Sequence, residues 1–158
     1  MKNVLAILLF VSGCSYGVDS NLSIPLNLSN QDDWVWTSAS LASSFWSDHG
    51  VAFEVGPTGN ITYHIGKIAP IGDESPIGEW HQTGYLKGEV RLIPELSQDE
   101  AGAACVHAHE WGHALGMQHV DEGFSLMSPH LMQEPNGDCC WSQLDQNEFC
   151  RVQPQLCK

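Results

Sequence analysis

The sequence predicts an α+β fold, because it combines short segments of strand character with two longer segments of helical character. Five short segments alternate apolar and polar residues or are rich in β-branched and aromatic ones. The longer segments begin with residues that cap helices. The last 20 residues hold four of the six cysteines, which indicates a short, cysteine-rich C-terminal subdomain after the two main helices.

Composition limits the partners that the chain can have. Its 158 residues suffice for one domain with a sizeable core, and 42% hydrophobic with 16% charged residues is typical of globular proteins. The formal net charge is -13, with only six Lys and Arg residues. A phosphate backbone would be repelled by this charge, so we expect no nucleic-acid partner.

Residues 1–13 are typical of a secretory signal peptide, with a basic start and an apolar run too short to span a bilayer. The stretch Val11-Ser12-Gly13-Cys14 resembles a bacterial lipobox, which implies that Cys14 is lipidated and becomes the new N-terminus. The alternative is a plain signal peptide cleaved a few residues later. Because Ser15 rather than Asp follows, the resemblance favours a lipid anchor in the outer membrane, with residues 14–21 as a tether.

Four elements are expected in the first part of the domain. They are strands at 22–28, 51–55 and 61–65, and a helix from the capping residues 29–33 to about Asp48. Pro25 indicates an edge or early position in the first strand. His49-Gly50 ends the helix. Its buried side is expected to contain Trp34, Ala39, Leu41, Ala42, Phe45 and Trp46.

The next segment is predicted to be mostly loop. Residues 66–81 are rich in Gly and Pro, which favours a long surface loop. Two more strands, 83–86 and 89–93, are expected around Lys87-Gly88. Four potential metal ligands lie in or beside the loop: His64, Asp73, Glu74 and His81. We expect them to be solvated, with a second metal site as the alternative.

Two helices are expected in the second half, from Ala101 to about Leu115 and from Leu144 to about Val152. Ser97-Gln98-Asp99-Glu100 is typical of a capping box, with Ser97 as N-cap and Glu100 three residues later. The alanines that follow favour helix and allow close packing. The first of these helices is therefore predicted to have a stable N-terminus.

One stretch of this helix carries the candidate chemistry. His109 and His113 are four residues apart, so both imidazoles leave one face of the helix and can hold one metal ion. Gly116 can take the left-handed conformation that ends a helix, and His119 can then supply a third ligand. Three protein ligands leave one tetrahedral position for water, which is typical of catalytic zinc. Glu110 lies beside the first ligand and can act as general base.

The stretch 109–119 resembles the zinc signature H-E-x-x-H-x-x-G-x-x-H of the metzincin metallopeptidases. Residues 125–129, Ser-Leu-Met-Ser-Pro, resemble their methionine turn; Met127 follows the last histidine by eight residues, which is most similar to the matrixin branch. The resemblance covers about residues 22–152. It implies a small twisted mixed sheet, a backing helix, a zinc helix and a catalytic domain at 22–158.

The resemblance also implies a mechanism and site residues. Zinc on the three histidines would polarise water and the scissile carbonyl while Glu110 moves the proton, so that peptide or protein substrates are cut internally. Met127 would form an apolar floor under the metal. Substrate would lie along an edge strand near Gly84, Tyr85 and Leu86. The pocket for the side chain after the cut would be lined by Ser128, Pro129, His130 and Leu131.

Five cysteines remain after Cys14, and in an exported protein they indicate disulfides. Two bridges are expected, drawn mostly from Cys139, Cys140, Cys150 and Cys157. These bridges would link the last helix covalently to the rest of the C-terminal subdomain. Cys105 lies one turn before the first histidine and is expected to be structural rather than a zinc ligand.

Two other functions stay open: zinc amide hydrolysis on peptidoglycan, and zinc binding without catalysis by a surface lipoprotein. The long histidine signature argues against the first. Glu110 argues against the second, because zinc binding alone needs no carboxylate at that position. No propeptide-sized segment separates Cys14 from the first strand, so control of activity is expected to come from a partner inhibitor protein.

Overall fold

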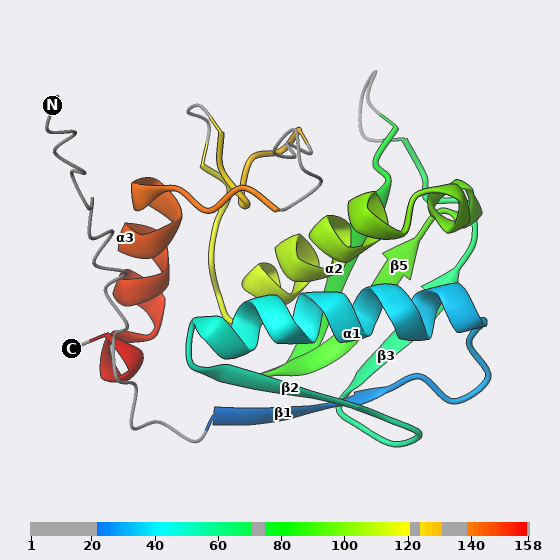
Figure 1. The fold of residues 1–158 in the computed structure, drawn as a ribbon, viewed down its shortest axis with the longest axis horizontal. Coiled ribbons are helices and arrows are strands. Elements are labelled where there is room, and N and C mark those ends of the chain that lie inside the picture. Colours follow the sequence, from blue (N-terminus) through cyan, green and yellow to red (C-terminus); the bar gives the residue numbers. More distant parts are fainter. Residues whose placement is uncertain (1–21, 71–74, 121–123, 131–138, 158) are drawn as a thin grey trace, which may run out of the picture.

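Five strands form one mixed sheet in the computed structural model, which describes residues 22–70, 75–120, 124–130 and 139–157 (Figure 1). The strands are β1 (Leu22–Asn27), β2 (Val51–Gly56), β3 (Ile61–Ile65), β4 (Gly78–Gly84) and β5 (Lys87–Leu92). Their order across the sheet is β2-β1-β3-β5-β4. Neighbouring strands are parallel except for β4 with β5, so β4 is an antiparallel edge strand. The predicted α+β class with a small mixed sheet is confirmed.

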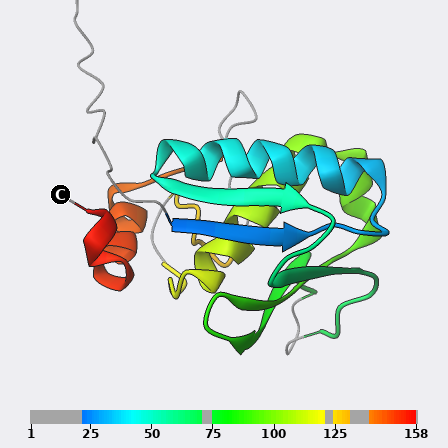
Figure 2. The same ribbon diagram turned by 90° about the horizontal axis from the view of Figure 1, so that it is seen from below.

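Two long helices, α1 (Asp33–Asp48) and α2 (Glu100–Ala114), lie against one face of this sheet (Figures 1 and 2). On α1 the fully buried apolar side chains recur every three or four residues: Val35, Ala39, Ala42 and Trp46. Leu41 was expected among them, but it is 50% exposed. That prediction is wrong because Leu41 precedes Ala42 by one residue and so points about 100° away from the buried stripe.

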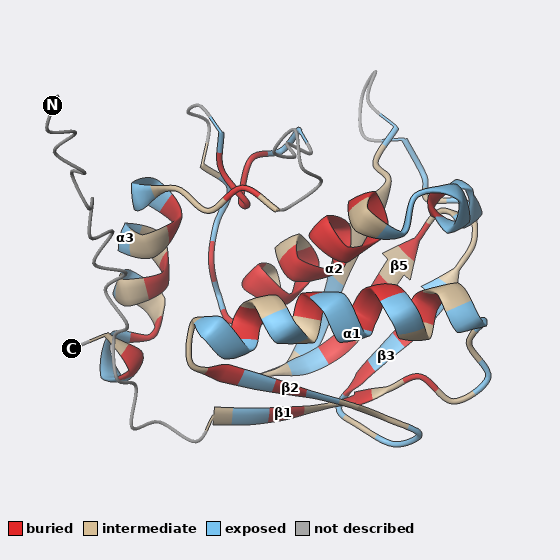
Figure 3. Cartoon of the chain, viewed as in Figure 1, coloured by how far each residue is buried: buried red, intermediate tan, exposed pale blue. Residues whose placement is uncertain are grey.

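The central element of the core is α2. Eleven of its 15 residues are buried, and Figure 3 shows burial along most of its length. A 3-10 helix, η1 (Pro94–Gln98), precedes it, and the N-cap is Asp99, whose Oδ1 accepts a hydrogen bond from the backbone N–H of Gly102 at 2.9 Å. The predicted capping box is therefore wrong, because Ser97 belongs to the 3-10 turn.

The hairpin of β4 and β5 differs from the prediction. Strand β4 begins at Gly78, five residues before the predicted start at Thr83, and so takes up the end of the predicted loop. The turn lies at Tyr85-Leu86, where Leu86 has a φ of 50°, rather than at Lys87-Gly88. The sequence of β4 shows no clear alternation of apolar and polar residues, and no residue of this strand is fully buried, so its pairing with β5 defines it.

The C-terminal part contains a short helix, α3 (Gln143–Val152), and a 3-10 turn, η2 (Pro154–Leu156), to one side of the sheet (Figure 1). Ser142 and Asp145 form a capping box at the start of α3. Two disulfides are present among the described residues, as expected, and they join Cys105 to Cys139 and Cys150 to Cys157. Three of these four cysteines come from the expected C-terminal set, and Cys105 of α2 is the fourth.

The predicted signal peptide, lipidated Cys14 and tether lie outside the described residues, as do Asp73, Glu74 and Leu131. Within the described ranges, no helix is long and apolar enough to cross a membrane.

Candidate metal centre and active-site cleft

Three histidines converge at the C-terminal end of α2. His109 and His113 lie one turn apart on this helix. The helix ends at Ala114, and Gly116 then takes a φ of 96°, the left-handed conformation that the sequence predicted. The chain turns back after Gly116 and places His119 opposite the two helical histidines.

The three Nε2 atoms form a small triangle. His113 Nε2 lies 3.1 Å from His109 Nε2 and 3.1 Å from His119 Nε2, and the third distance is 3.3 Å. Nitrogen ligands at 2.0–2.1 Å from a tetrahedral zinc would lie about 3.3 Å from one another. The triangle therefore has the size of a zinc ligand set. Within the described part of the chain it is the one cluster of three or more potential metal ligands.

Hydrogen bonds at the other ring nitrogen fix the direction of the lone pairs. His109 Nδ1 lies 2.7 Å from the carbonyl oxygen of Leu126, and His113 Nδ1 lies 2.9 Å from that of Met117. A carbonyl only accepts, so each Nδ1 carries the proton and each Nε2 presents its lone pair to the centre. Facing lone pairs repel unless a cation lies between them, so these residues fit a divalent metal.

Burial also keeps the ligands in the metal-binding form. Together with the neighbouring charge of protonated His113, it lowers the pKa of His109 to about 4. The pKa of His113 is lowered in the same direction, mainly by burial. Both imidazoles are thus neutral at neutral pH, as metal ligation requires.

The fourth histidine of the segment lies apart from this cluster. His107 is fully buried in the core, and its Nε2 lies 2.9 Å from Ser38 Oγ on α1. Burial lowers its pKa to about 3, so it is a neutral core side chain. His107 therefore links α2 to α1.

The methionine turn lies beneath the histidines. Met127 is fully buried, and a Cβ added to Gly112 of α2 would collide with the Met127 sulfur. Its carbonyl accepts a hydrogen bond from the backbone N–H of Val120 at 2.8 Å, next to the third histidine. Met127 thus packs against the helix that carries His109 and His113.

A buried carboxylate from α3 holds this turn. Asp145 accepts hydrogen bonds from Ser125 Oγ at 2.6 Å, from the backbone N–H of Leu126 at 2.9 Å and from that of Met127 at 3.0 Å. It also accepts bonds from the N–H and the hydroxyl of Ser142. One buried side chain therefore connects the start of α3 with the turn that orients His109.

Glu110 is the buried carboxyl of the site. It is 5% exposed, and the backbone N–H of Trp80 on β4 donates to it. Burial, and to a lesser extent the negative charge of Glu79, raise its pKa to about 8. Gly78 packs so closely that an added Cβ would lie 2.7 Å from Glu110 Oε1. The edge strand β4 therefore lies directly against the candidate base.

A cleft of about 900 Å³ contains the histidines and Glu110. Its walls are the segment 75–80 with Gln82, the face of α2, and residues 117–119 and 128–130. Ser128, Pro129 and His130 line it as expected. Gly84, Tyr85 and Leu86 do not, because they form the end of β4 and the hairpin turn. The part of β4 at the cleft is Gly78–Trp80 with Gln82 instead.

A family model described as matrixin matches residues 21–154. The chain belongs to the matrixin family. Matrixins are zinc-dependent peptidases, so the fold, the histidine cluster and the match together place this chain among the metallopeptidases. A search of curated proteins finds no match to it.

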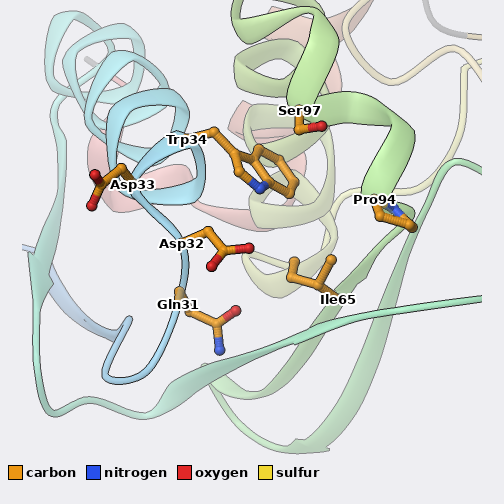
Figure 4. A pocket seen from close by; sticks show the side chains of 7 residues that line it. All are labelled: Gln31, Asp32, Asp33, Trp34, Ile65, Pro94 and Ser97. Atoms are coloured by element: carbon orange, nitrogen blue, oxygen red, sulfur yellow. The ribbon is translucent and has the colours of Figure 1, made fainter.

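A second pocket of this matrixin, near the start of α1, lacks comparable chemistry (Figure 4). Asp32 and Asp33 lie there, but their carboxylates point to opposite sides. It contains no histidine or cysteine. The cleft at α2 is therefore the better candidate for an active site.

Gly78 and Trp80 of the matrixin cleft, and Asp145 against the methionine turn, were not predicted as site residues from the sequence. Asp145 had one local signal, because Ser142-x-x-Asp145 has the spacing of a capping box. Its bonds to the methionine turn join residues 18–20 positions apart, which no local pattern reveals. Gly78 and Trp80 fell in the predicted loop.

Proposed function

We propose that this matrixin is a zinc endopeptidase in which His109, His113 and His119 hold the metal and Glu110 is the general base. The observation that carries the proposal is the joint arrangement of three converging imidazole Nε2 atoms and a buried carboxyl in one cleft at the open edge of β4. A site that only binds zinc has no need of the buried Glu110, whose burial costs stability.

Zinc would act as a Lewis acid that polarises the scissile carbonyl and acidifies the attacking water. Glu110 would take the proton of that water and deliver it to the leaving amine. Without a cation nearby, burial favours the protonated form of Glu110, since its pKa is raised to about 8. A divalent cation beside it would favour the carboxylate, which is the form that accepts a proton.

The substrate would bind as an extended strand. Strand β4 is the last strand of the sheet, and its Gly78–Trp80 part lines the cleft. A peptide laid along this edge could pair through backbone hydrogen bonds. Ser128, Pro129 and His130 form part of the cleft wall and would contact the side chain after the cut.

The test compares purified wild-type protein with Glu110→Gln and His113→Ala on a mixed peptide library, with and without chelator. Glu110→Gln should bind zinc but lose at least about 10²–10⁴-fold in turnover, because only the base is removed. His113→Ala should lose both zinc and activity. If Glu110→Gln cleaves peptides at the parental rate, the mechanism is wrong. If the parent binds zinc but cleaves no peptide, peptidoglycan amide hydrolysis and non-catalytic zinc binding become the better hypotheses.

The same proposal includes export and lipid anchoring through Cys14. The support is the sequence of residues 1–15, in which a basic start and an apolar run lead to Val-Ser-Gly-Cys-Ser. The two disulfides of the fold are compatible with an oxidising compartment outside the cytosol.

A further inference from the structure

Ionisable side chains form a row across the sheet, and this row ends on β4 beside the cleft. The register places His64 of β3 opposite Arg91 of β5, and Arg91 opposite Glu79 of β4. No further strand of the described sheet follows β4. A peptide strand added at this edge would therefore place one of its side chains next to Glu79.

The negative charge of Glu79 is only partly neutralised within the row. Arg91 donates from Nε to Glu89 Oε1 at 2.7 Å, whereas its Nη1 lies 3.4 Å from Glu79 Oε2. The Arg91 guanidinium thus pairs with two carboxylates, and these three groups together carry one excess negative charge. The side chain of Glu79 is 35% exposed, so an incoming cation can reach it.

Glu79 also lies between the two residues of β4 that contact the candidate base, Glu110. Its two neighbours in the strand contact Glu110, since the N–H of Trp80 donates to that carboxyl and Gly78 packs against it. Glu79 itself lines the cleft, and none of the described lining residues is Lys or Arg. A positively charged substrate group would meet no repelling cation on this wall.

We propose that Glu79 selects substrates that carry Lys or Arg beside the scissile bond, on the side of the substrate strand that faces away from α1 and α2. The inference rests on the proposed peptidase function and names its substrate class. The basic side chain would continue the alternation of charge that runs from Arg91 to Glu79. An opposite-charge pair on neighbouring strands corresponds to a preference of about 1.5- to 5-fold. The net charge of -13 would add faster encounter with cationic peptides at low salt.

The test uses a neutral peptide that the wild-type enzyme cleaves and a set of variants with Lys or norleucine at each of the three positions on either side of the cut. Norleucine has an apolar side chain of similar reach but carries no charge. The readout is the ratio of kcat/KM for the Lys and norleucine peptides at each position. We expect a ratio of about 1.5 to 5 at one position near the cut, and a smaller ratio as salt is raised.

Glu79→Gln should bring that ratio to about one. The ratio is the informative quantity, because Glu79 also raises the pKa of Glu110 and its loss would change the rates of both peptides. Glu54→Gln is the matched control: it removes the same charge from exposed Glu54 on β2, at the opposite edge of the sheet, and should keep the parental ratio.

Cleavage of the neutral peptide without any preference for Lys would overturn the inference and leave the peptidase proposal standing. A Lys preference that survives in Glu79→Gln would also overturn it, because another group would then be responsible. Failure to cleave any peptide would refute the proposed function, and this inference with it.

Discussion

Asp145 and His109 are connected through a single residue of the methionine turn. The Asp145 carboxylate accepts a hydrogen bond from the N–H of Leu126 at 2.9 Å, and the carbonyl of Leu126 accepts one from His109 Nδ1 at 2.7 Å. The helix α3 thereby fixes the orientation of a metal-ligand candidate on α2. The C-terminal subdomain thus positions a residue of the site in addition to packing against the core.

Asp145→Asn should weaken zinc binding and lower the stability of the fold. The amide keeps the size of the side chain, but it replaces one acceptor oxygen with an N–H group that faces backbone donors. We expect about 1–3 kcal/mol of lost stability and up to about 10-fold weaker zinc binding. Thermal unfolding and zinc titration against a competing chelator measure the two effects. Asp48→Asn, at the exposed end of α1, is the control and should change neither.

Gly78→Ala should slow catalysis while zinc binding persists. The added Cβ would lie 2.7 Å from Glu110 Oε1 and would also collide with Val106, so β4 must move away from the base. A displacement of about 1 Å near the reacting groups can cost up to about 10²-fold in kcat. Gly84→Ala is a matched control in the same strand, because its Cβ would meet Lys87 Cβ at an ordinary 3.6 Å. Equal kcat values for the two variants would contradict the close fit of β4 to Glu110.

Glu110→Gln should stabilise the metal-free protein at alkaline pH. Burial raises the pKa of Glu110 to about 8, above the ordinary value of 4.5, so the folded state favours the protonated form. Its contribution to stability is complete below pH 4.5 and is lost as pH rises through 8. Gln cannot ionise and so avoids that loss. We expect the variant to be more stable than wild type by about 1–3 kcal/mol at pH 8, with the difference shrinking towards pH 5.

Chemical denaturation of chelator-treated proteins across this pH range measures the effect. The depressed pKa of His109, about 4, removes stability as pH falls from 6.5, but it does so in both proteins and cancels from the difference. The exposed Glu95→Gln should show no such difference. A difference that grows towards acid pH would mean that the buried Glu110 is charged in the metal-free fold.

The metal cluster could be predicted from the sequence because its geometry is local. A four-residue spacing on a helix brings His109 and His113 together, and Gly116 permits the reversal that returns His119. Most strands and helices also followed from patterning and turn residues. These features depend on neighbours within one or two turns of chain.

The edge of the cleft could not be predicted in this way. Strand β4 is defined by its pairing with β5. The sequence around Gly78 and Trp80 predicts a loop, because its Gly and Pro residues outweigh any alternation. The partner of Cys105 depends on how α2 docks beside the C-terminal segment. Such long-range contacts arise from tertiary packing, which local sequence patterns do not encode.

The lipid anchor is tested by the mass of the mature chain. If Cys14 is lipidated, membrane-extracted protein should begin at Cys14 and carry the mass of added acyl chains. Cys14→Ala should abolish that mass and release the protein from the membrane fraction, because the anchoring residue is missing. An unmodified chain that begins downstream of Cys14 would refute the anchor and leave the catalytic proposal unaffected.

The two disulfides should differ in what they contribute to stability. Cys105–Cys139 closes a loop with a sequence separation of 34, and Cys150–Cys157 closes one of 7. Because each disulfide lowers the entropy of the unfolded chain, we expect the first to stabilise the fold by about 4 kcal/mol and the second by about 2 kcal/mol. We expect the double variant Cys105→Ala with Cys139→Ala to lower Tm more than Cys150→Ala with Cys157→Ala.

The first pair should also affect the site, because Cys105 lies one turn before His109 and Cys139 precedes the helix that carries Asp145. Zinc binding should therefore weaken in that variant and stay near wild type in the other. Urea unfolding and zinc titration of both variants, with reduced wild-type protein as a third sample, measure these effects. A larger stability loss from the short loop would show that strain or packing at Cys150 and Cys157, rather than loop entropy, governs the stability of this fold.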